Sequence, residues 1–418
     1  MFTKTNVCDK IIVVINMKRI IMHIDVNNAF LSWTAVDLLN KGYEIDIRKI
    51  ESVIGGDESK RHGIVLAKSP VAKKRGVQTA ETLMSARRKC RNLRIYPPDY
   101  NLYKKMSNAV FNTIRKYTPD LEILSIDECF IDYTNVYKLY GDPIKFAYKL
   151  KDEIYNTLKF TVNIGIANNK LCAKMASDFE KPNKVHTLFE EEVKTKMYPL
   201  PIRDLYGIGK SSSAKLLDLG INTIGDLANS NSYMLKKTFK NQAESMIEKA
   251  RGIDNSPVNA EEEDRKCISN STTFAYNLTN LSMIFQNLQA LVENVCITLR
   301  KDKKYASVVS VNIKDKEFHS YSKQKKLLNE TDNTDEIFKE IKKLFLEVWD
   351  EEPIRLLGVG LSHLSVNKKR QLSLFEEAED NEKDSELDKV LDKLKQQYGA
   401  NIVQKASLID NNITKKYD

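Results

Sequence analysis

The sequence has little of what marks zinc proteins, disulfide-rich secreted proteins and membrane proteins. Its six cysteines are scattered, and none has a Cys-x-x-Cys or Cys/His metal-binding spacing. Such cysteines are typical of reduced thiols, which predicts a cytoplasmic protein. The longest early apolar run, residues 11–15, is far too short for a signal peptide or a membrane span. We therefore expect no membrane association.

The composition is that of a folded protein with an excess of basic residues. Hydrophobic residues make up 42% and charged residues 29% of 418 residues, a length that allows about two to four domains. The net charge is +9, although residues 376–418 hold 11 acidic residues against 7 lysines. The positive charge of residues 1–375 favours a polyanionic partner such as nucleic acid, but many basic proteins bind none.

Residues 124–132 are the stretch that points to chemistry. They are interpreted as one strand with two adjacent carboxylates, Asp127 and Glu128, in its middle. Burying such a pair costs several kcal/mol unless cations neutralise it, and divalent metal ions usually do so. Because neighbours on an ideal strand point to opposite faces, we expect a strand end or a distortion here. An apolar strand at residues 20–24 also delivers Asp25, either as a metal ligand or as the N-cap of the next helix.

The elements around these acids predict a mixed sheet with helices on one face. A further strand at residues 160–167 passes directly into a helix that starts near Asn169, and the order is that of a split β-α-β domain. The apolar periodicity predicts helices over residues 31–39, 100–117 and 143–158.

Two lysines lie one turn apart on the helix that starts near Asn169. Lys170 is close to the helix N-terminus, where a cation suits triphosphate oxygens. For Lys174 we expect an ordinary surface lysine.

Residues 42–94 predict a small basic module. Short strands are expected at residues 45–50 and 64–68, followed by a basic helix that includes residues 87–94. The basic side chains form either a solvated face or a face toward phosphates, and both interpretations remain open.

Residues 199–228 predict a helix-hairpin-helix. Glycines at 207 and 209 would let the hairpin N–H groups approach a DNA phosphate, with Lys210 beside them. Gly209-Lys210-Ser211 imitates the end of a phosphate-binding P-loop. Asp204 stands where that motif needs its first glycine, so we reject a P-loop.

The remainder divides into a polar linker, a second α/β unit and a tail. Residues 266–366 follow the order β, α, β, β, α, β, with helices at 284–299 and 334–349 and basic clusters at strand ends. An apolar pentapeptide in the tail predicts an anchor for a partner, because nothing local can bury it; its apolar and amide side chains are Gln371, Leu372, Leu374 and Phe375. The acidic run at 376–386 is expected to be solvated and mobile, before a short amphipathic helix at 387–394.

Taken together, these residues resemble the Y-family DNA polymerases, the translesion class, from about Lys18 to Phe375. Each motif is short, but their order and spacing are specific. The motifs are Asp-Val-Asn at 25–27, Ser-Ile-Asp-Glu at 125–128, Gly-Ile-Ala-Asn-Asn-Lys-Leu-Cys-Ala-Lys at 165–174, Lys-Pro-Asn at 181–183 and Gly-Ile-Gly-Lys at 207–210.

The resemblance implies an α+β multidomain fold, a right-hand polymerase. Its parts would be a ferredoxin-like palm, small fingers, a helix-hairpin-helix thumb and a βαββαβ little finger. The implied boundaries are an N-terminal extension (1–17), palm (18–41 and 95–182), fingers (42–94), thumb (183–254), linker (255–265), little finger (266–366) and a tail (367–418) with a clamp-binding peptide (371–375).

The resemblance also implies a DNA-directed DNA polymerase of low fidelity that uses two Mg²⁺ ions, with Mn²⁺ as a substitute. Asp25 and Asp127 would bridge the ions, and the Val26 carbonyl and Glu128 would complete the ligands. Phe30 would be the steric gate that excludes a 2′-OH, although from the bare sequence it is more often a core residue.

In the fingers the chain departs from many family members. Lys170 would contact the triphosphate, but Pro70 and Lys73 stand where many members carry a tyrosine and an arginine. The Lys73 ammonium offers a point charge, whereas an arginine guanidinium would offer two parallel N–H donors. These positions favour the polymerase V catalytic-subunit branch over the polymerase IV branch.

The implied partners are primer–template DNA, dNTPs and, through residues 371–375, a sliding clamp. We expect a monomer and leave accessory subunits open. A nucleotidyl cyclase would share the palm carboxylates, but it would need no hairpin, basic fingers or clamp peptide. A non-catalytic DNA-binding module would need none of Asp25, Asp127 and Glu128.

Overall fold

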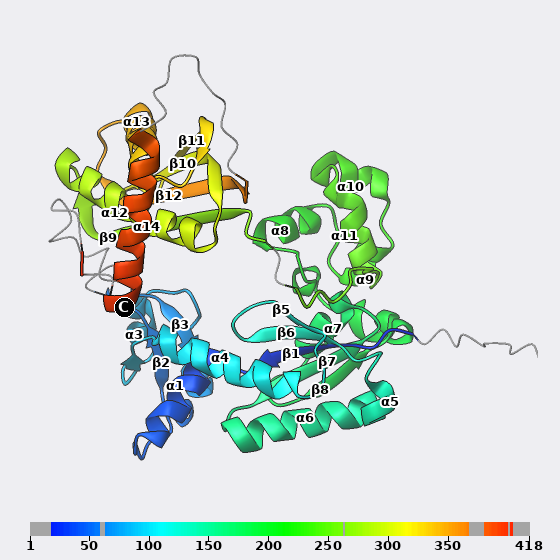
Figure 1. Cartoon of the computed structure of the whole chain (residues 1–418). Coiled ribbons are helices and arrows are strands. Elements are labelled where there is room, and N and C mark those ends of the chain that lie inside the picture. The colour runs from blue at the N-terminus through cyan, green and yellow to red at the C-terminus, as the bar shows by residue number, and fades with distance from the viewer. Residues whose placement is uncertain (1–17, 59–62, 262–263, 368–379, 400–401, 404–418) are drawn as a thin grey trace, which may run out of the picture. The chain divides into compact units, whose positions relative to one another are not determined.

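The computed structural model describes residues 18–58, 63–261, 264–367, 380–399 and 402–403 (Figure 1). The predicted N-terminal extension and the clamp-binding peptide lie outside these residues. The chain forms two compact units, residues 1–56 with 64–262 and residues 57–63 with 263–418, which are described separately. Within the described ranges, no helix combines the length and apolar character needed to cross a membrane.

The main sheet of the first unit has five strands in the order β5-β6-β1-β7-β8. The central strand β1 pairs antiparallel with β6 and β7, and β8 joins β7 in parallel. Since β8 belongs to this sheet, the sheet extends past residue 182, where the predicted palm segment ends. The strands are β1 (Ile21–Val26), β5 (Leu121–Ile123), β6 (Glu128–Asp132), β7 (Val162–Ala167) and β8 (Val185–Leu188).

Helices cover both faces of this sheet, so the expectation of helices on one face was wrong. One face packs on α1 (Ala29–Asn40), α4 (Tyr100–Arg115) and α6 (Pro143–Leu158). The opposite face packs on α7 (Lys170–Ser177). Gly165 of β7 allows α7 to pack this closely on the sheet. Any side chain there would clash, because a Cβ would lie 2.0 Å from the Ala173 carbonyl oxygen of α7.

A second, three-stranded sheet in the order β3-β2-β4 forms the predicted fingers. The prediction of a strand at residues 45–50 was wrong, because Ile47–Lys49 form a 3₁₀ turn. The Asp46 carboxylate stabilises this turn by accepting the Arg48 N–H and pairing with the Arg48 guanidinium. The elements are β2 (Ser52–Gly55), β3 (Val65–Lys68), β4 (Arg94–Tyr96), α2 (Pro70–Lys74) and α3 (Leu83–Lys89).

Short helices after β8 form the predicted thumb and share an apolar core with α7. The predicted hairpin glycines lie between a 3₁₀ turn, Ile202–Asp204, and α8. The helices are α8 (Lys210–Asp218), α9 (Ile224–Ala228), α10 (Ser232–Phe239) and α11 (Gln242–Ala250).

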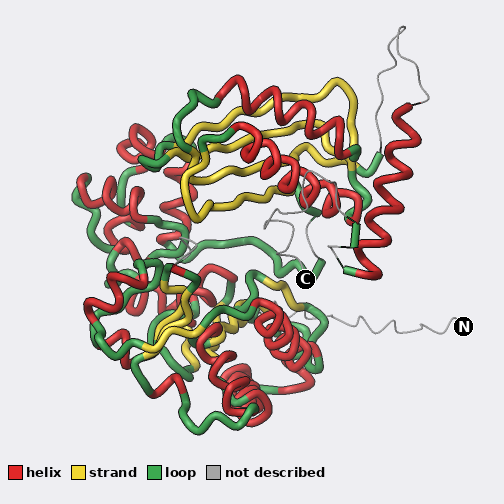
Figure 2. The backbone as a smooth tube through the Cα atoms, turned by 90° about the vertical axis from the view of Figure 1, so that its left-hand side faces the viewer, coloured by secondary structure: helices red, strands yellow, loops and turns green. Residues whose placement is uncertain are grey.

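The second unit confirms the predicted order β, α, β, β, α, β. Its four strands are ordered β11-β10-β12-β9, and two helices cover one face of the sheet (Figure 2). The elements are β9 (Cys267–Leu278), α12 (Leu281–Lys301), β10 (Tyr305–Asp315), β11 (Ser320–Thr331), α13 (Thr334–Val348) and β12 (Ile354–Ser365).

A third helix of this unit, α14 (Asp380–Tyr398), corrects the expectation for the acidic run, which is helical from Asp380 onward. Its Asp388 and Asp392 both bind the Arg300 guanidinium of α12, at 3.1 and 2.6 Å. The Arg300 side chain is only 7% exposed. The tail helix is therefore held to α12 by a largely buried ion cluster.

Candidate active site

Strand alternation places two of the predicted carboxylates on the sheet face that α7 covers. Asp25 of β1 lies directly opposite Glu128 of β6 in the antiparallel register. Their apolar neighbours Ile24 and Cys129 point into the other face. The register therefore brings Asp25 and Glu128, two of the predicted metal ligands, side by side on this face of the sheet.

Asp127 belongs to a turn and not to a strand. The N–H groups of Leu124 and Ser125 both donate to the Glu128 carbonyl, and β6 begins only at Glu128. The prediction of a single strand over residues 124–132 was therefore wrong. The predicted strand end at the acidic pair is confirmed, because β6 starts at Glu128. The Val26 N–H donates to the Asp127 carbonyl at 3.0 Å, which places Asp127 beside the end of β1. Its side chain accepts the Ser125 hydroxyl at 2.7 Å.

Two lysines lie among these carboxylates. Lys174 Nζ is 2.8 Å from Glu128 Oε1 and 3.9 Å from Asp25 Oδ2, and its side chain is 9% exposed. The expectation of a surface lysine was wrong, because α7 packs its Lys174 face on the sheet. Lys181 Nζ lies 2.8 Å from the same Asp25 oxygen. Asp178 contacts both ammonium groups, at 3.7 Å from Lys174 and 2.8 Å from Lys181.

The loop that carries Lys181 is fastened to the strands by buried amides. Asn163 of β7 donates to the Ser177 and Glu180 carbonyls and accepts the Lys184 N–H. Asn27 accepts the Asn183 N–H at 2.8 Å. The sequence indicated the Lys-Pro-Asn motif only as part of the resemblance. These hydrogen bonds show its local role, because they hold the loop that places Lys181 beside Asp25.

The environment separates the acidities of the two carboxylates. Burial raises the pKa of Asp25 to about 6, and the nearby ammonium of Lys181 only partly opposes this effect. The pKa of Glu128 is lowered to about 2 by its contact with His23 and by Lys174. His23, fully buried, lies 3.5 Å from Glu128 through Nε2, and burial lowers the pKa of its ring.

The donor set fits divalent metal ions, although its carboxylates are engaged by lysines. Carboxylate and carbonyl oxygens are the hard ligands that Mg²⁺ prefers, and Asp25, Glu128 and Asp127 provide them at adjoining strand ends. In the described part of the chain, no three His, Cys, Asp or Glu side chains already converge closely enough to hold a metal. A metal ion held by these carboxylates would require local rearrangement of their side chains.

Phe30 lies at the start of α1, in an aromatic cluster. Its ring stacks on Tyr103 with a centroid distance of 4.4 Å and an interplanar angle of 7°. Trp33 and Tyr100 also lie near the ring. Phe30 remains partly exposed, so it combines a fixed ring with an accessible surface.

The other predicted nucleotide contacts differ in accessibility. Lys170 is held by both Glu122 carboxylate oxygens, at 2.6 and 2.7 Å, and by the Pro257 carbonyl at 3.3 Å. Glu122 also accepts the Asn259 N–H at 2.8 Å, so the linker is bound here too. Lys73 is exposed on α2. Sequence patterns did not indicate Glu122 as a partner.

The predicted DNA-binding hairpin is exposed. Gly207 has a φ of +93°, which favours glycine, and Gly209 is exposed just before the first residue of α8. Lys210 is exposed beside them, and no side chain caps this helix start. Accessible N–H groups and a cation can therefore meet a phosphate.

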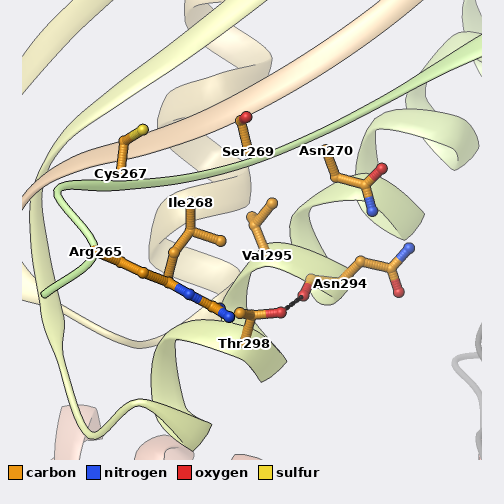
Figure 3. A pocket seen from close by; sticks show the side chains of 8 residues that line it. All are labelled: Arg265, Cys267, Ile268, Ser269, Asn270, Asn294, Val295 and Thr298. Atoms are coloured by element: carbon orange, nitrogen blue, oxygen red, sulfur yellow. Dashed lines mark hydrogen bonds between the residues drawn. The ribbon is translucent and has the colours of Figure 1, made fainter. Parts of the chain in front are cut away.

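A pocket in the second unit lies apart from the predicted site residues. It opens between the start of β9 and α12, where the Thr298 hydroxyl donates to the Asn294 carbonyl at 3.1 Å (Figure 3). Arg265, the one charged side chain among the described lining residues, pairs with Asp302. No acid or base converges there, so it is not a candidate active site. The lining residues are Arg265, Cys267, Ile268, Ser269, Asn270, Asn294, Val295 and Thr298.

Three family profiles match separate parts of the chain. Residues 24–178 match the impB/mucB/samB family, and residues 265–374 match its C-terminal domain. Residues 190–221 match the helix-hairpin-helix motif of the same family. Together these segments include the site carboxylates and the hairpin.

Curated relatives and solved structures resemble nearly the whole chain. DNA polymerase IV of Clostridium acetobutylicum is 47% identical, with 94% of this chain and 99% of the relative covered. DNA polymerase IV 1 of Bacillus subtilis is 31% identical, with 94% and 93% covered. A Y-family DNA polymerase chimera has a TM-score of 0.72 at 26% identity, covering 83% of this chain and all of the chimera. The two curated relatives carry the polymerase IV name, whereas Pro70 and Lys73 had favoured the polymerase V branch.

Proposed function

The chain belongs to the impB/mucB/samB family and is a Y-family, DNA-directed DNA polymerase of the translesion class, and we propose that it extends a primer 3′-OH by two-metal-ion nucleotidyl transfer. The observation that supports this mechanism best is the carboxylate site. Asp25 and Glu128 lie opposite each other on adjacent strands, and Asp127 lies in the turn beside them. This arrangement offers hard oxygens from strand ends to a substrate.

Each residue has a separate part in the proposed mechanism. Asp25, Asp127 and Glu128, with the Val26 carbonyl, would hold Mg²⁺ or Mn²⁺. Bound there, the ions would lower the pKa of the primer hydroxyl and neutralise charge on the triphosphate. The separated pKa values of Asp25 and Glu128 keep at least Glu128 ionised at neutral pH without metal. Lys170 would pair with the triphosphate after leaving Glu122.

Phe30 would act as the steric gate. Its ring is stacked on Tyr103, so it cannot turn aside easily to admit a bulkier sugar. A 2′-OH pressed against an aromatic ring also loses its hydrogen bonds to water. Deoxynucleotides are therefore the proposed substrates.

DNA would be held through its backbone by surfaces of both units. In the first unit, Gly207, Gly209 and Lys210 form the proposed phosphate contact. In the second unit, the inward strand residues pack on the helices, and the alternate residues form a small, polar face suited to a nucleic-acid backbone. This face includes Ser269, Ser271, Thr273, Ser310, Asn312, Gly358, Gly360 and Ser362.

Residues 371–375 are proposed to tether the polymerase to a sliding clamp. In the sequence the peptide lies between β12 and α14, and α14 is anchored on α12 through Arg300. Its apolar side chains resemble those of clamp-binding peptides, and tethering would raise the effective concentration of primer ends.

Primer extension tests the proposed mechanism. Purified protein with Mg²⁺, primer–template and dNTPs is expected to extend the primer, and Asp127→Ala is expected to abolish extension. Equal extension by the variant, or none by either protein, would refute the proposal. Omitting the template distinguishes a nucleotidyl cyclase, which would still consume the nucleotide.

A further inference from the structure

A histidine of β1 lies beside the carboxylate site and has no part in the proposed mechanism. His23 precedes Asp25 by two residues, so the alternation of a strand places both side chains on the same face of the sheet. In the register His23 stands opposite Phe130 of β6 and Gly165 of β7. Its ring packs on Phe130 at a centroid distance of 4.7 Å and is fully buried. The ring is therefore held firmly inside the fold.

The two ring nitrogens of His23 face different groups. Nδ1 lies 2.8 Å from the hydroxyl oxygen of Ser177, at the end of α7. Nε2 is buried and makes no hydrogen bond to any part of the chain that the structure describes. It lies 3.5 Å from Glu128 Oε2. Because buried nitrogens nearly always have a hydrogen-bond partner, this unpaired atom indicates an interaction with the Glu128 carboxylate.

The Glu128 carboxylate needs support at its place in the sheet. Glu128 is the first residue of β6, and its side chain is 22% exposed. A partly exposed side chain at a strand end can rotate unless its neighbours hold it. Lys174 lies 2.8 Å from Oε1, and His23 faces the other oxygen, Oε2. The buried ring can therefore fix the orientation of this carboxylate from inside the fold.

The Ser177 hydroxyl governs which nitrogen of the ring carries the proton. Its oxygen is 2.8 Å from both His23 Nδ1 and the Lys174 carbonyl oxygen, and its single proton can be donated to only one of them. Donation to Nδ1 leaves the ring proton on Nε2, which then donates to Glu128. The other tautomer would turn a bare Nε2 lone pair toward a carboxylate, and two facing acceptors are unfavourable. A doubly protonated ring would present the same Nε2–H to Glu128.

We propose that His23 is the positioning residue of Glu128: its Nε2–H holds Oε2 and so fixes the direction in which this carboxylate meets a divalent ion. Removal of a group that orients a metal ligand typically costs about 10- to 100-fold in metal affinity or activity. Since His23 is fully buried, it acts through Glu128 alone. The inference rests on the proposed metal site and extends it to the support of one ligand.

Histidine-selective nitrogen NMR of the full-length protein tests the tautomer without metal. The chain has five histidines, and the signals of His23 are those that disappear in His23→Gln. In EDTA we expect the ring of His23 to carry a proton on Nε2. A ring protonated on Nδ1 alone would have no donor for Glu128 and would overturn the inference. This measurement needs only the wild-type fold, so it decides even if a variant does not fold.

Manganese binding to the full-length protein tests the consequence for the metal site. Mn²⁺ affinity can be followed by electron paramagnetic resonance. His23→Gln places an amide N–H near the position of Nε2, whereas His23→Asn places it near Nδ1 and loses the donor to Glu128. We expect His23→Gln to bind Mn²⁺ within about 3-fold of wild type and His23→Asn to bind it about 10-fold more weakly.

His319→Asn is the matched control, and it is expected to bind Mn²⁺ as wild type does. His319 also contacts a carboxylate, Asp315 at 3.1 Å, but it belongs to the second unit. Equal weakening in His23→Gln and His23→Asn would mark His23 as a packing residue. Unchanged binding in both would show that Glu128 needs no support. Either result overturns the inference.

Asp127→Ala separates failure of this inference from failure of the proposed function. If Asp127→Ala binds Mn²⁺ as wild type does, the metal site itself is refuted. If Asp127→Ala loses Mn²⁺ while His23→Asn binds it as wild type does, only the role of His23 is refuted.

Discussion

At the scale of single residues, Asp25 of the proposed metal site carries its charge at a cost to the stability of the fold. Asp25 is nearly buried, and its pKa is raised to about 6 although Lys181 is in contact with it. The folded protein therefore binds this proton more tightly than the unfolded chain does. The contribution of Asp25 to stability falls as the pH rises from 3.8 to about 6.

Asp25→Asn is expected to stabilise the metal-free protein above pH 6. The substitution removes a carboxylate that burial disfavours, and we expect a gain of about 1–3 kcal/mol in unfolding free energy. The gain should disappear near pH 4, where Asp25 is protonated in the folded protein. Thermal or urea unfolding in EDTA at both pH values measures this, and a variant less stable than wild type at pH 7 would contradict it.

Phe30→Ala is expected to increase ribonucleotide incorporation. Removing the ring leaves space beside Tyr103 for a 2′-OH, and we expect discrimination between dNTP and rNTP to fall by about tenfold or more. Single-nucleotide insertion with each substrate measures the ratio. Phe318→Ala, which removes an exposed aromatic side chain of the second unit, is the control. Unchanged discrimination in Phe30→Ala would remove this residue from the gate.

At the scale of elements, α7 connects the sheet, the linker and the proposed nucleotide site. Gly165 lets α7 approach the sheet closely enough for Lys174 to reach Glu128. At the first turn of the same helix, Lys170 is bound by Glu122, which also holds the linker N–H of Asn259. A triphosphate that binds Lys170 must compete with this contact.

Glu122→Gln is expected to lower the KM for dNTPs. The amide is a weaker partner for the Lys170 ammonium, so more of the lysine is free for phosphate, and we expect a change of about 2- to 5-fold. Steady-state single-nucleotide insertion measures KM and kcat separately. Glu190→Gln, which removes an exposed partner of Lys18, is the control. A raised KM would show that Glu122 instead positions Lys170 for the nucleotide.

At the scale of the whole molecule, the basic excess and the acidic excess lie in different regions of the chain. The positive excess lies in residues 1–375, which contain the proposed DNA-binding surfaces, and the acidic tail follows them. Within the second unit, two aspartates of that tail pair with Arg300. Part of the negative charge of the tail is therefore neutralised by Arg300 within its own unit.

Substituting Leu374 and Phe375 together by Ala is expected to abolish stimulation by the sliding clamp and to spare basal synthesis. Tethering acts through effective concentration and leaves the chemical step unchanged. Primer extension with and without a clamp loaded on the template measures both quantities. Leu387→Ala, at an exposed apolar position of α14, is the control. Loss of basal activity together with stimulation would indicate that these side chains belong to the fold.

The local sequence determined the elements that carry the carboxylates. Asp127 and Glu128 adjoin short apolar strands, so periodicity and the cost of burying charge were enough to single them out. Asp25 could equally be a helix N-cap until the motifs were taken together. The order of the second unit was predicted for the same reason, since amphipathic helices and alternating strands leave their pattern in neighbouring residues.

Only the tertiary structure decided which face of the sheet α7 covers and what its lysines contact. The spacing of Lys170 and Lys174 shows that they share a helix face, but not what that face packs against. That depends on Gly165 in the preceding strand, where a missing side chain admits the helix backbone. The contacts of Lys174, Lys181 and Glu122 join residues distant in sequence, so they depend on packing and leave no periodic pattern in the chain.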